Sequence, residues 1–130
     1  MSENNIEKIY TPNAPAAIGP YSQAIKFADT VFTSGQIALD PVSGNIIGSD
    51  VREQTEQVMK NLSAVLTAAN ASFDTIIKTT CFLADMADFA SFNEIYGKYI
   101  TCAPARSCVV VKALPKGALI EVEAIAKTKQ

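Results

Sequence analysis

The sequence predicts an α+β fold in which one mixed β-sheet packs against two helices. Three observations lead to this prediction. Apolar and β-branched runs near both ends of the chain are typical of strands, two central stretches have helical periodicity, and 130 residues suit one domain. The expected order of elements over residues 1–130 is β-β-β-α-β-α-β-β, with both helices on one face of the sheet.

The first three strands are expected at residues 6–10, 21–27 and 31–37. Residues 11–20 contain three prolines and a glycine, which restrict the backbone and predict a loop. The sequence Ala-Asp-Thr at residues 28–30 predicts a tight hairpin turn between the second and third strands. A second cluster of turn residues follows at residues 40–45.

The apolar period becomes helical over residues 51–69. Asp50 and Glu53 resemble a capping box at the start of this first helix. Asp85 is the expected N-cap of a second helix, which Pro104 ends. One face of this second helix is aromatic, with Phe89, Phe92, Tyr96 and Tyr99.

A strand at residues 76–83 separates the helices, and strands at residues 107–114 and 119–127 end the fold, joined by a turn at residues 115–117. In the first of these last two strands, alternation places Cys108 and Val110 on one side and Val109 on the other. We expect both last strands to be apolar on both faces. Two helices cover only one face, so another copy of the chain is expected to bury the other, which agrees with a charged content of 18%.

The composition excludes several classes of protein. Histidine is absent, which excludes a Ser-His-Asp triad, a Cys-His pair and His-ligated zinc. Three cysteines without CxxC spacing predict neither a disulfide framework nor a zinc site. The net charge of −2 offers no footprint for nucleic acid, and no apolar run approaches the roughly 20 residues that span a membrane. Residues 1–5 lack the features of a signal peptide, so a cytoplasmic protein is expected.

Arg106 and the pair Glu121 and Glu123 are the side chains best suited to chemistry. Arg106 has two interpretations, a surface arginine at a sheet edge or a bidentate clamp for a carboxylate. Cys108 should share its face of the strand. Glu121 and Glu123 lie on one face of the last strand, either solvated or partly desolvated with a raised pKa suited to activating water.

Six short segments occur in a fixed order along the chain. They are residues 19–24 (GPYSQA), 33–37 (TSGQI), 92–96 (FNEIY), 104–109 (PARSCV), 114–115 (LP) and 120–126 (IEVEAIA). In this combination the chain closely resembles the RidA-type, imine-hydrolysing branch of the reactive intermediate deaminase (RidA/YjgF) family. The resemblance extends from about the first strand to the last.

That resemblance implies a homotrimer with a chorismate-mutase-like fold and active sites in the clefts between subunits. It also implies hydrolysis of 2-iminobutyrate and 2-iminopropionate to 2-keto acids and ammonia. In the family pattern the arginine of the P-x-R-S-C segment binds the substrate carboxylate, and here it is Arg106. The same matching assigns six further residues to the cleft: Tyr21, Ser34, Gly35, Asn93, Cys108 and Glu121. Which chain supplies Tyr21 relative to Arg106 stays open.

The implied reaction suits this inventory of side chains. An imine carbon is already electrophilic, so orientation and a polarised water suffice, and neither a metal nor a cofactor is expected. We expect Arg106 to fix the carboxylate and Glu121 to deprotonate the water, with Cys108 only lining the cleft. The alternative is a non-catalytic regulator that binds 2-keto acids in the same cleft. A ribonuclease is disfavoured by the pI near 5.0 and the missing histidine.

Overall fold

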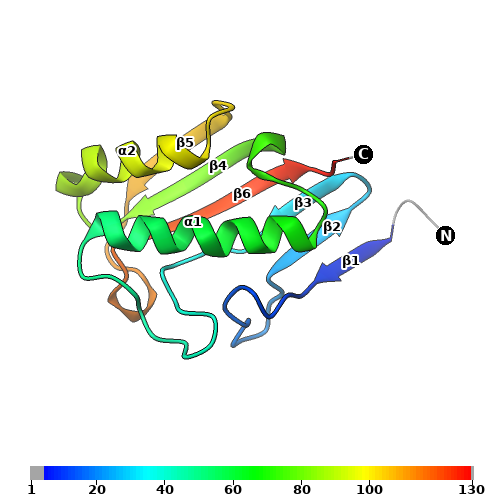
Figure 1. The fold of residues 1–130 in the computed structure, drawn as a ribbon, viewed down its shortest axis with the longest axis horizontal. Coiled ribbons are helices and arrows are strands. Elements are labelled where there is room, and N and C mark those ends of the chain that lie inside the picture. The colour runs from blue at the N-terminus through cyan, green and yellow to red at the C-terminus, as the bar shows by residue number, and fades with distance from the viewer. Residues whose placement is uncertain (1–4, 130) are drawn as a thin grey trace.

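Both helices lie on one face of a six-stranded sheet in the computed structural model of the protein, which describes residues 5–129 (Figure 1). The strands are arranged in the order β1-β2-β3-β6-β4-β5, and all neighbours are antiparallel except β4 and β5. The main elements are β1 (Ile6–Ile9), β2 (Ala24–Phe27), β3 (Thr30–Thr33), α1 (Val51–Ala68), β4 (Ile76–Leu83), α2 (Phe89–Tyr99), β5 (Ala105–Val110) and β6 (Ile120–Lys127).

The predicted order of elements and the predicted layers are confirmed, but several strand ends are wrong. Strands β2 and β3 are four residues each and pair through a hairpin in which Phe27 lies opposite Thr30. The segments expected to lengthen them, residues 21–23 and 34–37, are loops. Strand β5 begins two residues earlier than expected and ends at Val110. These loops matter because they form much of the candidate site.

Both predicted helix starts are close to the observed ones. The Asp50 side chain accepts a hydrogen bond from the Glu53 backbone N–H at 2.8 Å, while the Glu53 carboxylate accepts from Ser49 instead of from Asp50. Asp85 caps a short 3₁₀ turn (Met86–Asp88), and α2 begins only at Phe89. Within the described residues, neither helix is long and apolar enough to cross a membrane.

The core lies between the helices and the sheet. Strand β6 turns four fully or nearly fully buried side chains toward the helices: Ile120, Val122, Ala124 and Ala126. Helix α1 contributes an apolar stripe that includes Val58, Leu62 and Leu66, all with no exposed surface. The buried side chains that alternate along β6 and those that recur every 3.6 residues along α1 thus pack together in one core.

The expectation that both last strands are apolar on both faces is wrong for β6. Because side chains alternate, the face of β6 away from the helices presents Glu121, Glu123 and Ile125. This face, called the open face below, also carries polar side chains on β4, such as Lys78 and Thr80, which lie beside Ile125 and Glu123 of β6. Strands β1, β2, β3 and β5 supply exposed side chains to it: Ile6, Phe27, Phe32 and Val109. No helix in the described chain covers them.

The argument for a cytoplasmic protein rests on the first five residues. Residues 1–4 lie outside the part of the chain that the structure describes, so this expectation stays a prediction.

Candidate functional site

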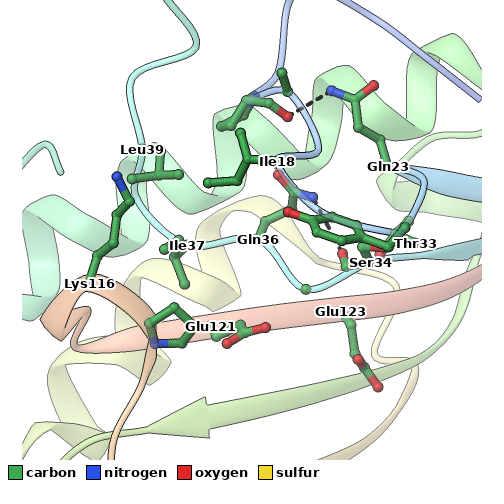
Figure 2. Close-up of a pocket in the computed structure, with 15 residues that line it drawn as sticks. Ile18, Gln23, Thr33, Ser34, Gln36, Ile37, Leu39, Lys116, Glu121 and Glu123 are labelled. Carbon is green, nitrogen blue, oxygen red and sulfur yellow. Dashed lines mark hydrogen bonds between the residues drawn. The ribbon is translucent and has the colours of Figure 1, made fainter. Parts of the chain in front are cut away.

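A cavity of about 570 Å³ opens where the loops after β3 meet the loop before β2 and the start of β6 (Figure 2). Four of the residues expected in the site line it: Tyr21, Ser34, Gly35 and Glu121. Glu123 also faces it, as does Lys116 from the 3₁₀ turn Pro115–Gly117. Its volume is within the usual range for small-molecule sites.

Glu121 packs directly over the backbone of Gly35. A Cβ atom added to Gly35 would lie only 1.9 Å from Oε2 of Glu121, so no other residue at this position allows the observed carboxylate. Burial, followed by the negative charge of Glu123, raises the pKa of Glu121 above its ordinary value of 4.5. A carboxyl group with a raised pKa is a stronger base than an exposed glutamate once it is ionised.

Ser34 and Tyr21 are held beside this carboxyl group by the loop that precedes β2. The Ser34 hydroxyl donates to the Ser22 carbonyl at 2.6 Å, and the Ser34 N–H donates to the Gln23 carbonyl at 2.9 Å. Tyr21 is half exposed, with 53% of its surface accessible. An aromatic side chain open to the cavity is free to pack on a ligand.

Arg106 lies on β5 and points to the helix side of the sheet, where its side chain contacts α2. Its Nη1 donates to Asn93 Oδ1 at 2.6 Å, and its guanidinium carbon lies 4.9 Å from the centre of the Tyr96 ring and 5.8 Å from that of Phe89. Stacking of this kind fixes the plane of the guanidinium group. A guanidinium has five N–H donors, so the bond to Asn93 leaves donors for a carboxylate.

Cys108 shares the helix side of β5 with Arg106, as expected from alternation, and its strand partner is Cys81. Burial raises the pKa of the Cys108 thiol, and Arg106 opposes this shift without reversing it. Burial raises the pKa of Cys81 to about 12. Both groups are therefore protonated thiols at neutral pH, which agrees with a lining role for Cys108 and not with a nucleophile.

Within one chain, the predicted site residues form two separate groups. Arg106, Asn93 and Cys108 lie together on the helix side of β5, at one edge of the sheet. Glu121 lies on the open face, and the cavity with Tyr21, Ser34 and Gly35 opens beside it. The sheet separates the two groups, so a single chain does not place a carboxylate between Arg106 and Glu121.

Sequence reasoning missed three residues that support these groups. Tyr96 and Phe89 were assigned only to the apolar face of a helix, yet they stack on Arg106. The spacing of Tyr96 three residues after Asn93 is a signal that both reach one neighbour. Gln23 belongs to a recognised motif, but its role as a buried link between loops depends on a fold that the motif does not reveal. Among residues 5–129, no cluster of potential ligands is arranged to hold a metal ion.

Comparisons with known proteins identify the family of this chain. The family model described as endoribonuclease L-PSP matches residues 11–128. The 2-iminobutanoate/2-iminopropanoate deaminase of Mus musculus is 50% identical over 119 residues, which cover 91% of this chain and 88% of that protein. AldR of Lactococcus lactis, whose name proposes a regulatory role, is 52% identical over 122 residues, which cover 93% of this chain and 97% of that protein.

Solved structures give the same result. The crystal structure of E. coli TdcF with bound serine matches with a TM-score of 0.90 and 42% identity, and the match covers 95% of this chain and 99% of that chain. Identity at this level over nearly the whole chain establishes common ancestry as well as a common fold. Reactive Intermediate Deaminase A of Arabidopsis thaliana is 50% identical over 129 residues, which cover 97% of this chain and 69% of that protein. The chain belongs to the reactive intermediate deaminase (Rid) family.

Proposed function

We propose that this protein is a 2-imino acid deaminase that hydrolyses 2-iminobutyrate and 2-iminopropionate to 2-keto acids and ammonia. The observation that carries the proposal is the pairing of a stacked, pre-oriented arginine with a partly desolvated glutamate, both at the positions expected from the family pattern. The mouse relative is named for this reaction. An anion clamp and a base are the two parts that the reaction needs.

In the proposed reaction Arg106 binds the substrate carboxylate through two N–H donors. Glu121 removes a proton from a water molecule whose oxygen attacks the imine carbon, and the nitrogen takes up a proton. Glu121 gives the proton that it took from water to this nitrogen, which becomes an amino group. In the resulting tetrahedral carbinolamine the hydroxyl passes its proton through Glu121 to the amino group, and its oxygen forms the new carbonyl as the C–N bond breaks. Ammonia then leaves and a 2-keto acid stays, so water supplies the oxygen of the product and no electrons change hands.

We further propose that each site lies between two copies of the chain in a homotrimer, with Arg106 from one copy and Glu121 from its neighbour. The separation of these residues by the sheet supports this arrangement. The open face supports it too, because Phe27, Phe32 and Val109 are 40–45% exposed there. Exposed apolar side chains gathered on one face of a soluble protein are typical of an interaction surface. A closed ring of three copies buries such faces and creates repeated grooves at their edges.

Complementation tests the shared site directly. R106A and E121Q subunits are each expected to be inactive as pure trimers. When the two are denatured together and refolded at equal ratio, every mixed trimer contains one groove with both residues intact. Random assembly then restores about a quarter of the wild-type sites. Ammonia release at that level supports a shared site, whereas no recovery places both residues in one chain's site.

A regulator that only binds 2-keto acids is the second candidate, and the name of AldR favours it. The deciding measurement is ammonia release from 2-iminobutyrate generated in situ, corrected for spontaneous hydrolysis. Saturable release that scales with protein concentration supports the enzyme. Tight keto-acid binding without any acceleration would support the regulator instead.

A further inference from the structure

The cavity beside Glu121 has an aliphatic end and a polar end. Figure 2 shows Ile18, Ile37 and Leu39 gathered on one side, where Lys116 also lies, with Ser34, Thr33 and Glu123 on the other side and Glu121 between them. The aliphatic residues come from two different loops, the one before β2 and the one after β3. We refer to Ile18, Ile37 and Leu39 as the aliphatic wall.

The cavity is larger than the small substrates considered above. A 2-imino acid with about seven heavy atoms displaces no more than roughly 200 Å³ of water, at about 30 Å³ for each water molecule. The cavity of about 570 Å³ in a single chain thus leaves room beyond such a ligand. Part of the cavity lining is apolar, and such side chains favour an apolar occupant.

Two buried amides hold the wall in place. Asn61, 1% exposed on α1, donates from Nδ2 to the carbonyls of Ile37 at 3.1 Å and Leu39 at 2.9 Å. Gln23, 3% exposed, donates from Nε2 to the Pro15 carbonyl at 2.8 Å and accepts from the Thr11 N–H at 2.7 Å. Both loops are therefore fixed before a ligand arrives, which reduces the entropy lost on binding.

Arg106 and Glu121 account for the carboxylate and the reacting centre of the substrate, but not for its amino-acid side chain. Its imine carbon has three substituents, and the carboxylate and the nitrogen need polar partners. The third substituent is the amino-acid side chain, for which the aliphatic wall is the apolar surface beside Glu121. A methyl group is too short to use that surface fully, whereas a branched four-carbon side chain reaches further along it.

We propose that Ile18, Ile37 and Leu39 form a side-chain subsite that gives the enzyme a preference for 2-imino acids with larger aliphatic side chains, such as the one derived from leucine. This inference rests on the proposed deaminase function. The wall acts on specificity because added methylene groups gain binding energy only where apolar surface is available. Each such group changes relative kcat/KM on the order of tenfold.

The test compares kcat/KM for 2-imino-4-methylpentanoate with that for 2-iminopropionate, both generated in situ from the amino acids by an L-amino acid oxidase. The wild type should favour the leucine-derived imine, and I18S and L39A should lower this ratio on the order of tenfold. V42S is the matched control, because Val42 is an apolar loop residue 95% exposed that does not line the cavity beside Glu121. Its ratio should equal that of the wild type.

Three outcomes overturn the inference: unchanged ratios in both wall variants, an equal fall in V42S, or dissociation of the I18S oligomer with an unchanged ratio. The last result would assign Ile18 to a contact between subunits. If the wild type hydrolyses no imine, the proposed function fails, and calorimetric binding of 4-methyl-2-oxopentanoate and pyruvate decides the subsite separately. Tighter binding of the larger acid that is lost in L39A supports it, and equal affinities refute it.

Discussion

The two groups of site residues are built in different ways. Arg106 lies on regular secondary structure, between β5 and α2, where Tyr96 and Asn93 hold its plane and one of its N–H groups. Glu121 also lies on a strand, but its surroundings are loops, and its position depends on the absence of a side chain at Gly35. Arg106 is held in position by contacts with neighbouring side chains, whereas the Glu121 carboxylate depends on the space that Gly35 leaves open.

This difference has a physical reason. A guanidinium group stays charged in any environment, so it tolerates stacking and hydrogen bonds that leave its charge unchanged. A carboxyl group that acts as a base must lose part of its solvation to gain basicity, which requires close packing on an apolar or backbone surface. Substitutions in the Arg106 group should therefore weaken ligand binding, whereas substitutions in the Glu121 group should lower turnover.

The largest effect is expected for Arg106→Ala. Loss of two charge-assisted hydrogen bonds, worth together roughly 3–6 kcal/mol, should lower kcat/KM by about 10² to 10⁴. Arg106→Lys should recover little, because an ammonium group lacks the planar pair of donors. Arg52→Ala is the matched control, since Arg52 is the other arginine of the chain and pairs with Glu94 on the helices. Steady-state kinetics that show R106A as active as R52A would refute the anion clamp.

The next effect is expected for Glu121→Gln, which should lower kcat by about 10²-fold with little change in keto-acid affinity. Burial raises the pKa of Glu121, so the folded state binds its proton more tightly than the unfolded state does. The contribution of Glu121 to folding stability is therefore complete below its ordinary pKa of 4.5 and is lost as pH rises through the raised value.

The same substitution should thus raise the melting temperature relative to the wild type at neutral pH, and not at acidic pH where Glu121 is protonated. Thermal melts across pH check this sign. A variant with unchanged turnover and weakened keto-acid binding would make Glu121 a ligand-binding residue instead of a base.

A smaller effect is expected for Gly35→Ala, which forces the Glu121 carboxylate from its position because the added Cβ overlaps Oε2. We expect kcat to fall by about tenfold, since a displacement of about 1 Å costs reactivity while the fold persists. Gly97→Ala is the control, because a Cβ at this site on α2 meets no atom within 4 Å. That control should keep its activity and gain about 0.5–1 kcal/mol of stability in a denaturant titration.

The smallest effect is expected for Glu123→Gln, and it appears in the pH dependence. Glu123 contributes to the raised pKa of Glu121 after burial, so its neutralisation should lower that pKa but keep it above 4.5. The acid limb of the kcat/KM profile, where Glu121 gains its proton, should move to lower pH. An acid limb that stays in place would show that Glu121 does not control it.

The sequence by itself determined the order of elements and the core. Alternation on residues 120–126 and helical periodicity on residues 51–66 specify which side chains are buried, because local periodicity and burial are tied to the same backbone geometry. It also pointed to Arg106 and Glu121 as candidate site residues, through the segments PARSCV and IEVEAIA. Strand ends were less certain, because residues 34–37 have strand-like composition but turn away to line a cavity.

Only the tertiary structure decided which residues face each other. Arg106 and Glu121 are close in sequence and belong to consecutive strands, yet in the sheet order β6 pairs with β4, and alternation points the two side chains to opposite faces. The stacking of Tyr96 on Arg106 and the contact of Gly35 with Glu121 also join distant segments. Such contacts depend on strand register and helix packing, which a local pattern does not encode because one residue of slip reverses every face.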